Sequence, residues 1–161
     1  ETMQRLEFEI RRRQSLLWGG IAGALAAAAG AAVWGAIAYV GNVEIGWIAI
    51  GIGFLVGIAV LVAGRGVTPQ FGVLGAGLAL LGVLGGKYIA MVAFIAQESE
   101  LGMLETMGLL DAATLVEVFQ MSFHPLDLLF YGLALWCGFK YSFRRIELAV
   151  AQRLGAESVA Q

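Results

Sequence analysis

Hydrophobic residues in this chain are gathered into long runs separated by shorter polar segments. Four such runs can be marked, over residues 16–40, 46–64, 71–96 and 126–139. A bilayer's hydrocarbon core requires roughly 20 helical residues, within a range of about 17 to 25. The first three runs meet that length, and the fourth meets it when it is extended to residues 124–141. The pattern therefore predicts four transmembrane helices.

The first run also has features of a cleavable signal sequence. Its beginning, "RRRQSLLWGGIAGALAAAAGAA", combines a basic start with small residues. The apolar part of a signal peptide is about 7 to 15 residues long, and this run is much longer and is followed by further runs. These points favour a retained span. The chain begins at Glu1 instead of a methionine, which is compatible with an upstream portion that has been removed.

The polar segments complete an all-α, polytopic membrane fold. Residues 1–15 are expected to form a juxtamembrane helix that runs straight into the first span, and residues 16–143 the membrane domain. Within that domain, residues 97–123 form an outer cap, where "TMGLLDAATLVEVFQM" is typical of an interfacial amphipathic helix. Residues 144–161 are expected to form a short helix that ends at Gly155, followed by a fraying tail.

Composition excludes an ordinary soluble domain. The chain is 60% hydrophobic and 14% charged, whereas soluble domains are about 45 to 50% apolar and about 25% charged. Glycine is abundant, with 23 residues, and there are only 2 prolines. Such a composition favours helices that pack closely in lipid.

Charged residues are segregated along the chain, which predicts an orientation. All basic residues outside the runs lie before the first, between the second and third, or after the fourth: Arg5, Arg11, Arg12, Arg13, Arg65, Lys140, Arg144, Arg145 and Arg153. The other two loops are acidic and contain no Lys or Arg. By the positive-inside rule both termini are cytoplasmic. A bacterial inner membrane, with contacts to its lipids, fits this bias best.

Glycines recur at helical spacing within the runs. Gly75, Gly82 and Gly86 share one face of the third span, and Gly53 and Gly57 share a face of the second. Helices in a bilayer associate through close backbone approach, which small residues permit. Helix packing is the preferred interpretation. A conduit lined by glycines, or glycine hinges, is the alternative.

Lys87 is the one charged residue deep inside an apolar run, in "LLGVLGGKYIAMVAFI". Depending on where the hydrocarbon core begins, the side chain either snorkels to the outer surface or is buried and requires a partner. Asp127, at the start of the fourth span, is the expected counter-ion, and Glu44 is second. We expect a structural tether between Lys87 and Asp127, with an ion site as the alternative.

Residues that carry familiar chemistry are sparse. The chain has no phosphate-binding glycine loop, no H-E-x-x-H, no C-x-x-C and no G-x-S-x-G. His124 and Cys137 are single residues of their kind, so no histidine pair or cysteine set can bind a metal within one chain. We expect His124 to cap the last span and Cys137 to act as a small apolar residue. No enzyme activity, cofactor, metal or nucleic-acid partner is expected.

The segments "FHPLDLLFYGLALWCGFKYSFR" and "LLGVLGGKYIA" resemble uncharacterised small multi-pass proteins of bacterial inner membranes. The resemblance covers the C-terminal half and implies no reaction, ligand or site residue. The expected function is a structural or accessory subunit that packs with itself or with a larger membrane complex. A small oligomeric channel or transporter that uses Lys87 and an acidic outer mouth is the main alternative, and an electron-transfer or pigment-binding subunit is a third.

Overall fold

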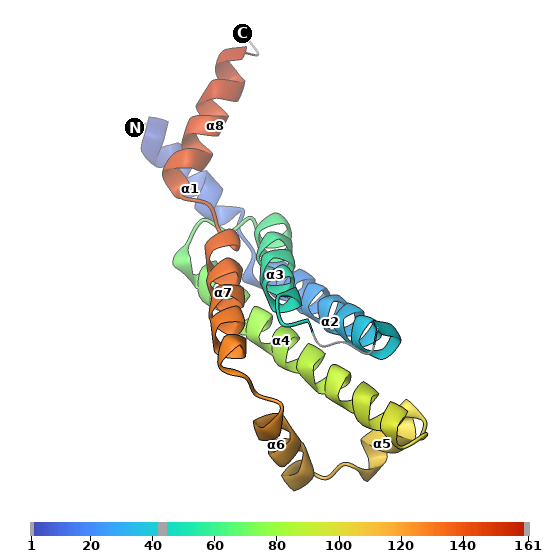
Figure 1. The fold of residues 1–161 in the computed structure, drawn as a ribbon. Coiled ribbons are helices and arrows are strands. Elements are labelled where there is room, and N and C mark those ends of the chain that lie inside the picture. The colour runs from blue at the N-terminus through green and yellow to red at the C-terminus, as the bar shows by residue number, and fades with distance from the viewer. Residues whose placement is uncertain (1, 42–44, 160–161) are drawn as a thin grey trace.

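The protein is an all-α molecule, seen here in a computed structural model that describes residues 2–41 and 45–159. The described residues form eight helices and no strand (Figure 1). They are α1 (Thr2–Arg12), α2 (Leu16–Gly41), α3 (Ile48–Gly64), α4 (Pro69–Glu98), α5 (Met103–Leu109), α6 (Ala112–Met121), α7 (Pro125–Tyr141) and α8 (Ile146–Val159).

Four of these helices build the body of the molecule. α3 and α4 contact each other, and each also packs against both α2 and α7. α1 and α8 contact each other at the end that carries both termini, and α5 and α6 lie at the opposite end (Figure 1). The two ends are therefore built from separate short helices, and the body between them is a four-helix bundle.

The interior of the bundle is built mainly from small residues. Buried positions on α2, α3, α4 and α7 include many alanines and glycines, among them Ala38, Ala49, Ala79, Gly53 and Gly75. Large apolar side chains on the same helices point outward, including Leu25, Leu55, Val62, Val73, Leu81, Leu128 and Trp136. Trp34 and Phe71 are the largest buried exceptions. Soluble proteins show the reverse tendency, because burial of large apolar side chains stabilises them.

Two helices in the described part of the chain, α2 and α4, are long and apolar enough to cross a membrane. They contain 26 and 30 residues, whereas α3 and α7 contain 17 each. The four expected runs thus coincide with four helices whose ends differ from the sequence boundaries by at most two residues. Length and composition alone mark only the two longer ones as possible spans.

The expectation of a helix that continues from α1 into the first span is wrong. The chain leaves helical structure between Arg12 and Leu16, because Ser15 donates its backbone N–H to the Gly64 carbonyl, at 2.8 Å. The Ser15 hydroxyl in turn accepts the backbone N–H of Trp18, at 3.4 Å, in the position of a helix N-cap. This interruption attaches the start of α2 to the end of α3.

The outer segment and the C-terminal helix also differ from expectation. The stretch expected to form one amphipathic helix is divided into α5 and α6, because Asp111 accepts the backbone N–H of Thr114 at 2.8 Å and caps α6. Hydrogen bonds from Thr114, from its side chain and then its backbone, lower the pKa of Asp111. At the C-terminus, α8 continues through Gly155 to Val159 and does not end at the glycine.

Candidate functional site

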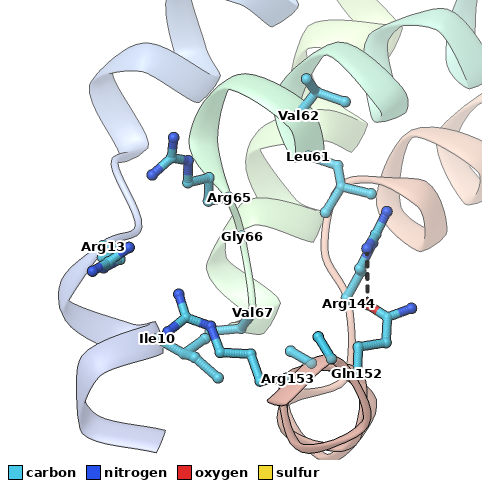
Figure 2. Close-up of a pocket in the computed structure, with 12 residues that line it drawn as sticks. Ile10, Arg13, Leu61, Val62, Arg65, Gly66, Val67, Arg144, Gln152 and Arg153 are labelled. Carbon is cyan, nitrogen blue, oxygen red and sulfur yellow. Dashed lines mark hydrogen bonds between the residues drawn. The ribbon is translucent and has the colours of Figure 1, made fainter. Parts of the chain in front are cut away.

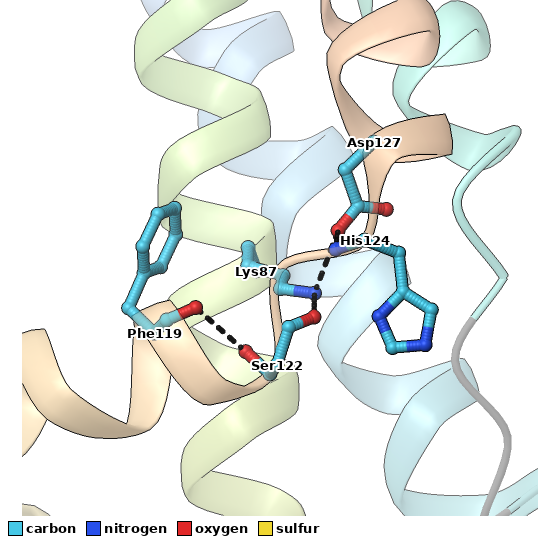
Figure 3. Close-up of polar contacts among 5 residues, drawn as sticks. All are labelled: Lys87, Phe119, Ser122, His124 and Asp127. Carbon is cyan, nitrogen blue, oxygen red and sulfur yellow. Dashed lines mark hydrogen bonds and ion pairs between the residues drawn. The ribbon is translucent and has the colours of Figure 1, made fainter.

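Lys87 lies inside the bundle, where α4 meets the start of α7. Its side chain is 2% exposed, and its Nζ lies 3.4 Å from Oδ2 of Asp127 (Figure 3). Nζ also donates to the Ser122 carbonyl, at 3.2 Å. The lysine therefore contacts both the first turn of α7 and the segment that joins α6 to α7.

Asp127 is held in place by the way α7 begins. Pro125 occupies the first turn, where a missing N–H costs no hydrogen bond. The Asp127 carboxylate accepts the backbone N–H of His124 through Oδ2, at 3.1 Å, and the Asp127 N–H donates to the His124 carbonyl, at 2.9 Å. A carboxylate in the first turn is also favoured by the helix dipole. One oxygen of Asp127 thus serves both the helix start and Lys87.

Burial distinguishes a lysine whose ammonium reaches water from one that is enclosed by the protein. A snorkelling lysine keeps its ammonium in water, whereas this one is enclosed and has an anionic partner and a carbonyl partner. By helical rise it lies roughly 27 Å from the start of α4 at Pro69 and roughly 16 Å from the end at Glu98. The ammonium is thus placed in the half of α4 nearer to α5 and α6.

The geometry is that of a closed ion pair. The Asp127 side chain is 14% exposed, so the pair has limited access to solvent on the carboxylate side only. A buried charge whose partner is removed is costly. The arrangement can therefore attach α4, α6 and α7 to one another, which is the chemistry expected of a tether.

The second candidate counter-ion, Glu44, falls outside the described residues. Among the described residues, the structure places Asp127 beside Lys87, as expected of the first candidate. His124 occupies the N-cap position of α7, and its backbone makes the hydrogen bonds given above. Cys137 is a buried free cysteine in α7. Among the described residues, no group of three or more His, Cys, Asp or Glu side chains converges in a way that could hold a metal ion.

The glycines singled out in the sequence all lie where helices touch. On α4, Gly86 faces α2, and a Cβ added there would lie 2.7 Å from the Trp34 ring. Gly82 faces both α3 and α2, because an added Cβ would lie 2.9 Å from Cγ2 of Ile52 and 3.1 Å from the Ala27 Cβ. Gly75, on the same helix, faces Gly138 and Ser142 of the α7 region. The glycines expected to share one face of α4 therefore contact three different neighbours, α2, α3 and the α7 region.

The glycines of α3 face α7. A Cβ on Gly53 would overlap the backbone of Ala134, and one on Gly57 would lie 2.9 Å from the Tyr141 Cβ and 3.0 Å from the Cys137 carbonyl oxygen. Backbone atoms cannot move aside as a flexible side chain can, so these positions exclude any side chain larger than hydrogen without a shift of α7.

A cavity lined by arginines is a polar feature that the sequence did not predict. Four arginines from distant parts of the chain, Arg13, Arg65, Arg144 and Arg153, line a cavity of about 650 Å³ at the end that carries both termini (Figure 2). The segregation of basic residues had grouped them on one side of the molecule, but sequence spacing gives no sign that they share a cavity.

Comparisons with protein-family models, with curated proteins and with solved structures found no match.

Proposed function

We propose that this chain is a four-helix integral protein of a bacterial inner membrane and acts as a non-enzymatic structural or accessory subunit. α2, α3, α4 and α7 would cross the bilayer with both termini in the cytoplasm. Support for membrane placement comes from the distribution of residue sizes, with small residues buried and large apolar side chains exposed along the bundle. In lipid this exposure has no hydrophobic cost, and small residues let the helices approach closely.

The observation that carries the structural role is the closed contact of Lys87. Intramembrane ionisable residues are costly and usually mark a functional site or a partner. Here the ammonium is already engaged by Asp127 and by the Ser122 carbonyl, each on a different side of the α6–α7 junction. The charge is used to join elements of the protein, which favours a scaffold over a passage for ions.

The proposal predicts an assembly larger than the 17.0 kDa chain. After gentle extraction with its surrounding lipid, native mass spectrometry is expected to detect the chain in a complex with further copies of itself or with other membrane proteins. Dilution in mild detergent should leave the stoichiometry unchanged. Recovery as a monodisperse monomer without any copurifying subunit would contradict the proposed role.

A small channel or transporter is the second candidate, because a lysine that is 2% exposed inside a helical bundle is the type of residue that ion pathways use. The structural role predicts that liposomes containing the purified protein show no ion flux above that of empty liposomes. Flux in the wild type that is lost in Lys87→Met would support the channel instead. Lys140→Met, which changes an exposed lysine at the end of α7, is the matched control.

A further inference from the structure

The arginine cavity lies where the N-terminal helix, the α3–α4 connection and the C-terminal helix meet. Figure 2 shows guanidinium groups of Arg13, Arg65, Arg144 and Arg153 arranged around it, contributed by four separate segments. No carboxylate is among the twelve described residues that line it. Four like charges around one space repel one another, and an anion placed between them removes that repulsion.

Contacts within the protein satisfy these arginines only in part. Arg153 forms an ion pair with Glu9, at 4.0 Å, and Arg144 donates to the Gln152 side chain, at 3.3 Å. Arg13 and Arg65 form no ion pair with any residue that the structure describes. Two guanidinium groups, each with donors suited to a phosphate ester, are thus available at the cavity.

The backbone at Arg65 fixes where this arginine leaves α3 at the edge of the cavity. Arg65 has φ 51° and ψ 39°, the left-handed conformation in which a helix commonly ends with glycine. Glycine stands at the next position instead, where a Cβ would lie 2.8 Å from both the Phe71 Cβ and the Ser142 carbonyl oxygen. This close packing requires a glycine at position 66. The left-handed position that ends α3 is therefore taken by Arg65, in a conformation that side chains other than glycine adopt with some strain.

The walls of the cavity add an apolar surface to the positive one. Leu61 and Val62 belong to the last turn of α3, and Val62 is 69% exposed. If α3 crosses the bilayer as proposed, these side chains lie at the membrane edge and the guanidinium groups lie just beyond it. An apolar surface beside a cationic one matches a lipid, whose acyl chain and phosphate are joined in one molecule.

We infer that this cavity binds the phosphate ester of an anionic phospholipid. The headgroup lies among the arginines, and the part of the acyl chain nearest to the headgroup lies against Leu61 and Val62. The inference rests on the proposed membrane placement and adds a specific ligand class to it. A soluble phosphate has the same anionic chemistry but no use for the apolar wall, so the two sources can be separated by experiment.

The test measures lipid retention by the purified full chain. In delipidated detergent solution, phosphatidylglycerol is titrated against phosphatidylcholine and inorganic phosphate, with bound species counted by native mass spectrometry and the thermal midpoint followed in parallel. Phosphatidylglycerol is expected to bind and raise the midpoint, and the other two are not. Arg65→Gln and Arg144→Gln should each weaken phosphatidylglycerol binding about fivefold. Arg145→Gln, next to the cavity lining but outside it, should leave binding unchanged.

Arg65→Gly keeps the test independent of folding. Glycine relieves the left-handed strain, so the lipid-free midpoint should equal or exceed that of the wild type while phosphatidylglycerol affinity falls. Equal binding of phosphatidylcholine, a midpoint shift with inorganic phosphate, or equal losses in Arg144→Gln and Arg145→Gln would each overturn the inference. Carbonate extraction separates failure of the lipid site from failure of the proposed membrane placement. Wild-type protein that stays in the membrane but shows no lipid preference overturns the lipid site alone, and release into the supernatant overturns membrane placement and the lipid site together.

Discussion

Alanine at Gly53 is expected to separate α3 from α7 and lower the free energy of unfolding by about 1 to 3 kcal/mol, the usual cost of overpacking a close contact. The added methyl group would overlap the carbonyl oxygen of Ala134 and lie 2.8 Å from its Cα. These are backbone atoms of the neighbouring helix, so relief requires movement of α7 as a whole. The loss should appear in detergent thermal unfolding and in reversible denaturant titration.

Gly51 is the matched control, because it lies two residues away on the same helix and a Cβ there would meet nothing within 4 Å. Gly51→Ala should be neutral or slightly stabilising, since alanine is the better helix former. The same pair exists on α4, where Gly75 faces Ser142 and Gly77 faces open space. Gly75→Ala should destabilise and Gly77→Ala should not. Equal effects within either pair would show that helix propensity, and not contact between helices, governs these positions.

The main helices could be predicted from the sequence because a long apolar run leaves few other structures available. Each expected run corresponds to a helix with ends displaced by at most two residues, as in α4, which begins at Pro69 and ends at Glu98. The glycine faces were also accessible, since helical spacing fixes which residues share a face. The neighbouring helix that each glycine contacts could not be predicted, because spacing alone does not show that Gly75 faces α7 while Gly86 faces α2.

The short helices were predicted less well, because their ends depend on contacts between distant segments. α1 and α2 are separate helices because Ser15, between them, donates a hydrogen bond to Gly64. The two residues are 49 positions apart in the chain (64 − 15). The arginine cavity depends on the same kind of information. Arg13, Arg65 and Arg144 are separated by whole helices, and only the packed bundle brings them together.

Removal of the carboxylate beside Lys87 is expected to be the most damaging polar substitution in the bundle. Asp127→Asn removes the carboxylate that lies 3.4 Å from a buried ammonium, and breaking a fully buried ion pair in this way costs about 3 to 5 kcal/mol. The lower end applies here, because the Asp127 side chain is 14% exposed. Lys87→Met should cost less, about 1.5 to 3 kcal/mol for the loss of charged hydrogen bonds, since Asp127 still accepts the His124 N–H. Denaturant titration in detergent measures both.

The double variant Lys87→Met with Asp127→Asn separates a tether from two independent residues. If the two side chains act as a pair, the double variant should be less destabilised than the sum of the single ones, by about 0.5 to 3 kcal/mol. Lys140→Met, at an exposed lysine whose Nζ lies 4.3 Å from the centre of the Trp136 ring, should cost less than about 1 kcal/mol.

Hydrogen exchange should locate the damage as well as measure it. Because Lys87 contacts the Ser122 carbonyl as well as Asp127, both single variants should increase exchange most at the α6–α7 junction and in the first turn of α7, and less in α2 and at the far end of α4. Loss of a tether adds local opening to the global loss of stability in this way, whereas a global loss alone raises exchange without this local excess. Unchanged stability in both single variants would exclude the tether, and Lys87 would then have to be explained by another role.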